Sequence, residues 1–250
     1  HVRDPLGEGL ADLAARRIRF VGAPADRIRE DYLRILRFFR FSAWYGVAET
    51  GPDAEALAAC AELADGIDSL SRERVGAEMR KLLSAPDPAP ALAAMQATGV
   101  LARVLPGADA RAMAVLVHLE AGIAPDWRRR LVVLGGEGAA KALRLSRADE
   151  RLVEALHAAI GQADTAAALG YRLGVDAGAS AVLARAALIG APLPDLWQAA
   201  LAEGAVARFP VTAADLMPAL SGPEIGRRLK ELELAWVASG FTLTRAEMLH

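Results

Sequence analysis

Residues 29–41 read Arg-Glu-Asp-Tyr-Leu-Arg-Ile-Leu-Arg-Phe-Phe-Arg-Phe, and their spacing predicts an α-helix with two distinct faces. Residues three or four apart share a face of a helix, so Asp31 and Arg34 are predicted to project together, with Glu30 and Arg37 beside them. Apolar side chains gather on another side, where they can be buried: Ile28, Tyr32, Ile35, Leu36 and Phe39. The stretch therefore predicts a partly buried helix that presents a carboxylate beside guanidinium groups.

A carboxylate beside a guanidinium can read the edge of a nucleotide base. Asp31 can accept from the exocyclic amino group of C or A, while Arg34 can donate to the neighbouring ring nitrogen or carbonyl. U and G present the opposite pattern of donors and acceptors, so this pair predicts acceptance of C and A. The alternative is a solvated ion pair, because Glu, Asp and Arg at this spacing are common on exposed helix faces.

Four segments along the chain carry a resemblance to a known family. Glu30-Asp31-x-x-Arg34-x-x-Arg37 resembles motif D of the class II CCA-adding tRNA nucleotidyltransferases and their bacterial poly(A) polymerase relatives. Residues 4–13 are similar to motif C, although Glu8 separates two glycines that are more often adjacent. Residues 73–78 match the Glu-Arg-x-x-x-Glu of motif E, and residues 222–227 with Trp236 resemble the tail region.

The resemblance implies an enzyme that adds C and A to the 3′ end of tRNA, without a template, from CTP and ATP. It implies nucleotide binding by Asp31 and Arg34 with Glu30 and Arg37. It also implies that Glu73, Arg74 and Glu78 brace the motif D helix. The alternatives are a poly(A) polymerase of the same family and a non-catalytic helical RNA-binding module.

The partners of the bracing residues can be narrowed from spacing. Arg74 precedes Glu78 by four positions, the weaker order for a local helical pair, so each is predicted to find a tertiary partner such as Glu30, Arg37 or Arg40. The alternative is an ordinary exposed helix with Glu73 near its positive N-terminus.

The carboxylates of the family's chemistry are missing from this sequence. Polymerase-type transfer uses clustered carboxylates to hold Mg²⁺ ions, and the family provides an Asp-x-Asp pair, which occurs nowhere in these 250 residues. We therefore expect a C-terminal portion without most of the catalytic head, no catalytic residue and no metal ligand in this chain, and no transfer activity from the chain alone.

Hydrophobic periodicity predicts an all-α fold with a short β remnant, a strand over 17–21. Helices are predicted over 27–45, 53–65, 71–84, 88–98, 108–122, 127–143, 147–159, 163–174, 177–188, 194–203, 212–219, 222–239 and 244–249. Breaks rich in Pro and Gly suggest four segments. These are a head remnant (1–26), a neck with the nucleotide-reading helix (27–106), a body (107–191) and a tRNA-binding tail (192–250).

Charge and composition narrow the class further. The net charge is −2, yet residues 1–46 hold nine Arg and six acidic residues, a net +3. A second basic cluster, Arg128-Arg129-Arg130, is a candidate for contact with tRNA phosphates. Cys60 lies among apolar neighbours and is predicted to be a buried thiol. No run of eighteen apolar residues occurs, so we expect a cytoplasmic protein that does not enter a membrane, with unknown oligomeric state.

Overall fold

The computed structural model describes residues 4, 7–47, 51–217 and 219–250. Pro5 and Leu6 of the motif C resemblance lie outside the described residues. The chain divides into two compact units. The first holds the described residues up to His157 together with Leu183–Ala191, and the second holds Ala158–Val182 and Pro192–His250. The predicted tail thus falls in the second unit with part of the predicted body, and the four-segment division stays a prediction.

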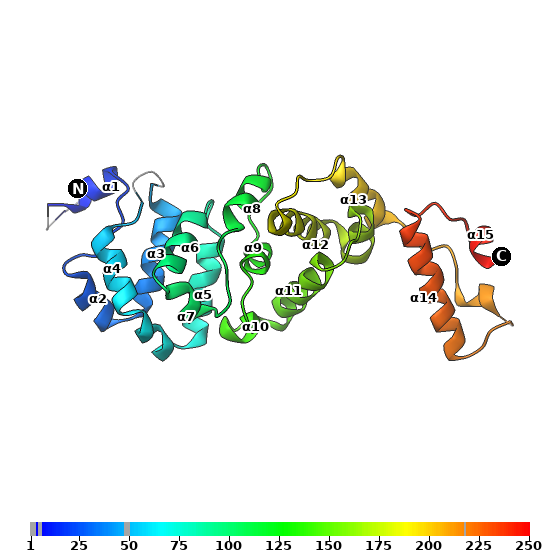
Figure 1. Ribbon diagram of the computed structural model, residues 1–250, viewed down its shortest axis with the longest axis horizontal. Coiled ribbons are helices and arrows are strands. Elements are labelled where there is room, and N and C mark those ends of the chain that lie inside the picture. The colour runs from blue at the N-terminus through cyan, green and yellow to red at the C-terminus, as the bar shows by residue number, and fades with distance from the viewer. Residues whose placement is uncertain (1–3, 5–6, 48–50, 218) are drawn as a thin grey trace. The chain divides into compact units, whose positions relative to one another are not determined.

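The first unit is a stack of short helices (Figure 1). They are α1 (Gly9–Ala14), α2 (Pro24–Glu30), α3 (Leu33–Tyr45), α4 (Ala54–Glu62), the 3₁₀ helix η1 (Ala64–Ser69), α5 (Arg72–Leu83), α6 (Ala89–Ala97), α7 (Val100–Val104), α8 (Met113–Leu119), α9 (Trp127–Leu134), α10 (Ala139–Ala142), most of α11 (Arg147–Ile160) and the C-terminal part of α12 (Ala166–Ile189).

Helix α3 is the centre of this unit, because it packs against both α5 and α6 (Figure 1). Its predicted apolar face is buried, including Ile35, Leu36 and Phe39. Tyr32 lies just before α3, and its ring occupies the space that a Cβ on Gly66 would need, at 1.9 Å. Close packing therefore requires glycine at position 66 of the 3₁₀ helix η1, which faces Tyr32.

The predicted helix over 27–45 is wrong in one respect, since the helix is interrupted between Glu30 and Leu33. Asp31 is extended (φ −159°, ψ 107°), and its Oδ1 accepts the backbone N–H of Leu33 at 3.1 Å. Aspartate favours such local side-chain bonds over a helix interior. Asp31 therefore ends α2 and helps to start α3.

The predicted strand over 17–21 is also wrong, because residues 17–20 have no regular secondary structure. A strand needs a neighbour to pair its backbone groups, and the described residues contain no strand, only an isolated bridge between Ala108 and Gly135. The segment is instead held by side chains: the Phe20 ring stacks on Phe38 with centroids 5.5 Å apart. The all-α part of the expected fold is confirmed.

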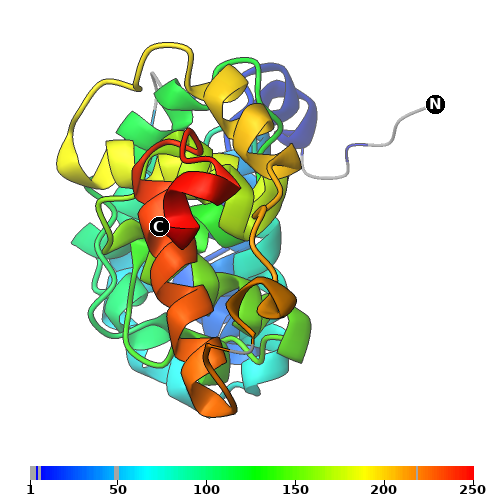
Figure 2. The same cartoon turned by 90° about the vertical axis from the view of Figure 1, so that its right-hand side faces the viewer.

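The second unit packs around an aromatic cluster in the C-terminal part of the chain. Trp236 is buried and contacts the rings of Tyr171, Phe209 and Phe241 at centroid distances of 5.5, 5.6 and 4.8 Å. Figure 2 shows α15 beside α14, and Met248 of α15 joins the same core. The elements are the N-terminal part of α12 (Ala166–Ile189), α13 (Trp197–Val206), the 3₁₀ helix η2 (Ala213–Leu216), α14 (Pro223–Ala238) and α15 (Arg245–Leu249).

Two helix starts and one helix interruption in this unit lie where the sequence predicts them. Thr212 and Asp215 form a reciprocal capping box, as do Thr244 and Glu247. Gly174, with φ of 76°, interrupts the helix labelled α12 between the two helices predicted for 163–174 and 177–188. In the described part of the chain, no helix is both long enough and apolar enough to cross a membrane.

Candidate nucleotide-binding site and the buried arginines

Arg34 projects from the first turn of α3 and is held at one nitrogen. Its Nη1 donates to Glu30 Oε2 at 2.6 Å and to the backbone carbonyl of Arg27 at 3.0 Å. Nη1 carries two hydrogens, so both are used. Because Nε and Nη2 bond to no described residue, the side of the guanidinium that can donate two parallel hydrogen bonds is open to a ligand.

Glu30 accepts hydrogen bonds from two arginines, one on each side of the interruption between α2 and α3. Oε1 accepts from Arg27 Nη1 at 2.8 Å while Oε2 accepts from Arg34. These bonds, that of Arg34 first, hold the pKa of the Glu30 carboxyl below its ordinary value. Glu30 is thus a charged acceptor that orients Arg34.

A cavity of about 360 Å³ opens beside Arg34. Its walls combine arginine with aromatic and aliphatic side chains: Ile18, Arg19, Phe20, Val21, Arg27, Arg34, Arg37, Phe38 and Phe41. Arg37 is exposed and makes no ion pair with any described residue. A flat aromatic wall and an open guanidinium suit a planar base, and free arginine suits phosphate.

Asp31 does not line this cavity, and its carboxylate does not pair with Arg34. Arg74 Nη2 donates to Asp31 Oδ1 at 3.1 Å and to Oδ2 at 2.8 Å. The predicted juxtaposition of Asp31 and Arg34 side chains on one continuous helix is therefore corrected, because the break after Glu30 turns Asp31 toward α5. The two residues remain linked by the backbone, where Arg34 N–H donates to the Asp31 carbonyl at 3.0 Å.

The three residues predicted to brace motif D find separate partners. Arg74 holds Asp31, and Glu78, buried in α5, accepts from Arg40 Nε at 2.7 Å. Glu73 is exposed and pairs with Arg144 at 2.8 Å, away from α3. Arg74 and Glu78 thus contact the motif D region, whereas Glu73 does not. Arg40 is one of the partners that the sequence had suggested for Arg74 and Glu78, and the structure pairs it with Glu78.

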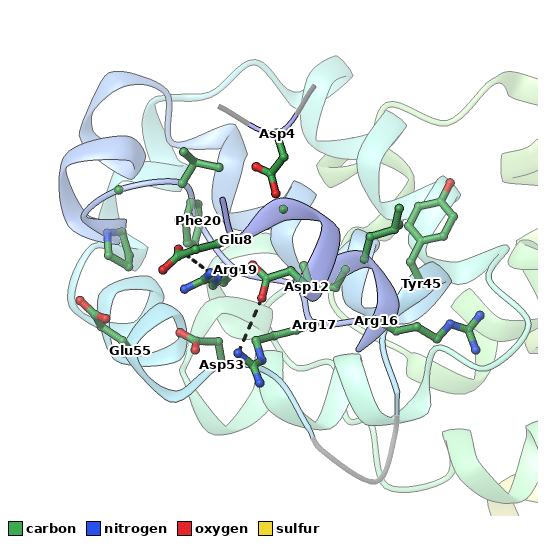
Figure 3. Close-up of a pocket in the computed structure, with 16 residues that line it drawn as sticks. Asp4, Glu8, Asp12, Arg16, Arg17, Arg19, Phe20, Tyr45, Asp53 and Glu55 are labelled. Carbon is green, nitrogen blue, oxygen red and sulfur yellow. Dashed lines mark hydrogen bonds and ion pairs between the residues drawn. The ribbon is translucent and has the colours of Figure 1, made fainter. Parts of the chain in front are cut away.

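A larger cavity of about 920 Å³ lies around the motif C segment (Figure 3). Arg19 reaches between two carboxylates there, and its Nη2 donates to Glu8 Oε2 at 2.6 Å while Nε donates to Asp12. Asp4 accepts the backbone N–H groups of Gly7 and Leu10. The acidic residues of this segment are thus occupied by arginine and backbone donors.

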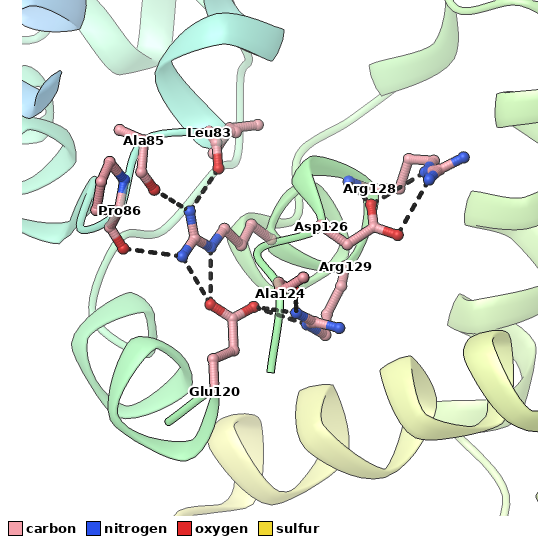
Figure 4. Close-up of polar contacts among 9 residues, drawn as sticks. Leu83, Ala85, Pro86, Glu120, Ala124, Asp126, Arg128 and Arg129 are labelled. Carbon is pink, nitrogen blue, oxygen red and sulfur yellow. Dashed lines mark hydrogen bonds and ion pairs between the residues drawn. The ribbon is translucent and has the colours of Figure 1, made fainter. Parts of the chain in front are cut away.

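The expected phosphate contacts at Arg129 and Arg130 are contradicted by burial. Both side chains are inside the first unit, and both pair with the buried carboxylate of Glu120 (Figure 4). Arg130 also donates to the backbone carbonyls of Leu83, the last residue of α5, and of Ala85 and Pro86 just after it. A buried guanidinium needs a full set of acceptors, and these groups supply it.

Arg128 differs from its two neighbours because it reaches the surface. It pairs with Asp126, whose Oδ1 accepts from Nε at 3.0 Å, and with Asp149 at 3.6 Å. Of the three predicted residues, Arg128 alone has a partly exposed side chain. The repeated arginines gave no sequence signal that two of them would be buried.

Sequence reasoning also missed Arg27, Arg19 and Glu120. Arg27 precedes Glu30 by three positions on a helix, a spacing that could have indicated the pair. The pairing of Glu120 with Arg129 and Arg130 depends on how α8 packs against α9. No local pattern would have identified it.

Parts of the sequence match a protein-family model and known proteins. Residues 52–111 match the family model described as "Probable RNA and SrmB- binding site of polymerase A". A mouse protein, "CCA tRNA nucleotidyltransferase 1, mitochondrial", is 48% identical over 79 residues, which cover 30% of this chain and 18% of that protein. The "Multifunctional CCA protein" of Burkholderia mallei (strain SAVP1) is 40% identical over 109 residues, covering 44% and 25%.

A solved structure, the Bacillus stearothermophilus CCA-adding enzyme in complex with CTP, superposes with a TM-score of 0.69 and 26% identity. The match covers 95% of this chain and 64% of that one, so the fold is that of the helical part of such an enzyme. The chain is thus similar to CCA-adding tRNA nucleotidyltransferases, and part of it matches a family model named for polymerase A. It spans less than two thirds of the length of these relatives.

Proposed function

We propose that this chain selects the nucleotide and binds the RNA in an enzyme that adds C and A to the 3′ end of tRNA, using CTP and ATP. The relatives named for CCA addition support the reaction, and the CTP complex of the similar Bacillus enzyme supports the substrate class. The observation that carries the proposal for this chain is the held guanidinium of Arg34 beside an aromatic and arginine-lined cavity.

Arg34 is assigned the donor side of base reading. Its Nε and Nη2 can donate together to the ring nitrogen and carbonyl of C, or to a ring nitrogen of A. Fixing Nη1 on Glu30 and the Arg27 carbonyl removes rotamer freedom before the nucleotide arrives, which lowers the entropy lost on binding. Arg37 is assigned to the phosphates, because it lines the same cavity and has no partner among the described residues.

Asp31 does not line the cavity of Arg34, but it follows Glu30 directly in the chain, and we assign it the acceptor side of base reading with Arg74 as its tether. A carboxylate offers about four acceptor positions, and Arg74 and the Leu33 N–H use three hydrogen bonds to it. One position on Oδ2 is thus left for an exocyclic amino group. U and G would place an oxygen there and meet repulsion instead.

Mg²⁺ is not assigned to this chain. Two-metal transfer needs clustered carboxylates, and the described residues hold no group of three or more His, Cys, Asp or Glu placed to bind a metal ion. The residues present do not fit the ions. We propose that the Mg²⁺ ions are held by a catalytic head, which corresponds to the part of the CCA-adding enzymes that this chain does not match.

The RNA-binding role is proposed for both units. The family model over residues 52–111 is described as an RNA-binding site, which supports contacts from the first unit. In the second unit, Arg227, Arg228 and Lys230 of α14 are exposed and can reach phosphates. Proteins recognise A-form RNA mostly by its shape and by contacts to its sugar-phosphate backbone, and we expect this mode of tRNA binding here.

The description of the family model, which names polymerase A, favours a second candidate, poly(A) addition. Supplying the protein, expressed from its whole reading frame, with tRNA ending before CCA, after C or after CC separates the activities. Addition of C, C and A in order supports the proposal, and many A residues on any RNA indicate a poly(A) polymerase. RNA binding without any transfer indicates a non-catalytic module.

A further inference from the structure

Arg27 is an arginine of α2 that contacts three groups in or beside the cavity that Arg34 lines. Its Nε donates to the backbone carbonyl of Val21 at 2.9 Å, and its Nη1 donates to Glu30 at 2.8 Å. Its own carbonyl oxygen accepts from Arg34 Nη1 at 3.0 Å. One residue therefore connects the irregular segment before α2 with the carboxylate and the guanidinium that follow it.

The connection through Glu30 determines how Arg34 is presented. Arg27 and Arg34 take different oxygens of the same carboxylate, so the position of Glu30 is fixed by both. Without Arg27, Glu30 would retain Arg34 but lose its second anchor, and the carboxylate could turn about its own side-chain bonds. Arg34 would then keep only its bond to the Arg27 backbone carbonyl as a fixed anchor, and the direction of its open side would be less constrained.

The contact with Val21 adds a second effect. Val21 and Phe20 line the cavity, and in the described residues their segment has no strand neighbour to hold it. The Arg27 bond to the Val21 carbonyl attaches this wall to α2. Loss of the bond would loosen this wall of the cavity.

We propose that Arg27 is a positioning residue for base selection, which fixes the orientation of Arg34 through Glu30 and thereby favours C and A over U and G. The inference rests on the proposed function, in which Arg34 reads the base. Arg27 itself does not contact the base in this scheme.

The exposure of these side chains distinguishes a role of Arg27 in base selection from a role in holding the fold together. The side chains of Arg27, Glu30 and Arg34 are 44%, 46% and 36% exposed. Ion pairs with this exposure contribute little to folding. A change at Arg27 is therefore expected to leave the protein folded, so that an altered selectivity reports on the site.

Arg29 offers a matched control on the same helix. It is also exposed, and it pairs with Asp26 at 3.3 Å and with Glu62 at 3.7 Å, outside the cavity. Arg29→Ala removes the same charge from α2 as Arg27→Ala does. A difference between the two variants therefore cannot come from net charge or helix propensity.

The experiment measures kcat/KM for incorporation of all four nucleotides by the protein expressed from its whole reading frame. We expect Arg27→Ala to lower the preference for C and A over U and G about fivefold or more, part of the discrimination typical of a two-bond base contact. Arg27→Lys keeps a donor for Glu30 and should restore part of the preference. Arg29→Ala should leave the preference unchanged, and all variants should melt within a few degrees of the wild type.

A double variant tests whether Arg27 acts through Arg34. If it does, Arg27→Ala adds nothing to the loss caused by Arg34→Ala, because residues acting as one unit are not additive. Additive losses would mean that Arg27 contacts the nucleotide directly, and an unchanged preference in Arg27→Ala would overturn its role. A wild-type protein without any preference for C and A would instead overturn the proposed function.

Discussion

The carboxylate of Asp31 is bound by Arg74, a residue 43 positions further along the chain, with Nη2 lying 2.8 Å from Oδ2. The contact joins the break between α2 and α3 to the first turn of α5. Asp31 is also bonded to the Leu33 N–H, so the carboxylate that ends one helix and starts the next is fixed from two sides. The position of this carboxylate therefore depends on Arg74, a residue outside the motif D segment.

Replacing Arg74 with Ala tests this tether. We expect the KM for CTP and ATP to rise several-fold with little change in stability, because the pair is partly exposed and ion pairs of this kind contribute about 1 kcal/mol or less. Steady-state kinetics and thermal melting measure the two effects. Arg72→Ala on the same helix turn, which removes an arginine without an ion pair among the described residues, is the control. Equal KM values for the two variants would contradict the assignment.

Arg34→Ala should keep nucleotide transfer but lose discrimination for C and A over U and G. Removing a two-bond donor typically forfeits ~1–3 kcal/mol of base discrimination. Arg34→Lys is a sharper variant, since it keeps the charge but cannot donate two parallel bonds. Incorporation of each of the four nucleotides provides the measurement. Unchanged selectivity in Arg34→Ala would mean that Arg34 and Glu30 are a surface ion pair.

Arg130→Gln should destabilise the first unit far more than Arg128→Gln. Removing Arg130 leaves Glu120 and three backbone carbonyls with fewer donors in a buried site, which typically costs ~3–5 kcal/mol. Arg128 is partly exposed, so its loss should cost about 1 kcal/mol or less. Urea unfolding followed by circular dichroism gives both values. Similar costs would show that Arg130 is not required to hold the end of α5.

Cys60 should resist alkylation in the folded protein. Burial raises the pKa of its thiol to about 12 from 9.0. The neutral thiol is thus favoured in the folded state, and this contribution to stability is full below pH 9.0 and is lost as the pH rises toward about 12. Labelling with iodoacetamide at pH 8 should be slow until urea is added. Rapid labelling of the native protein would place Cys60 at the surface.

The sequence predicted the helical class and most helix positions, because the signals involved are local. Hydrophobic periodicity in residues 33–45 identified the buried face of α3, with Ile35, Leu36 and Phe39. Thr212 and Thr244 stand at the starts of the helices predicted over 212–219 and 244–249, and the structure shows a capping box at each. The buried thiol of Cys60 was likewise predicted. Periodicity and caps extend over about four residues, so they can be recognised without the fold.

The tertiary structure alone decided which charged groups meet. The sequence offered Arg34 as a neighbour for Asp31, yet Arg74 occupies that carboxylate and Glu30 holds Arg34. Arg128, Arg129 and Arg130 look alike in sequence, but only the packing of α8, α9 and the end of α5 determines that two are buried on Glu120. The expected strand failed for the same reason, since a strand requires a partner that local sequence does not specify. Long flexible charged side chains can reach several partners, and burial and backbone direction select among them.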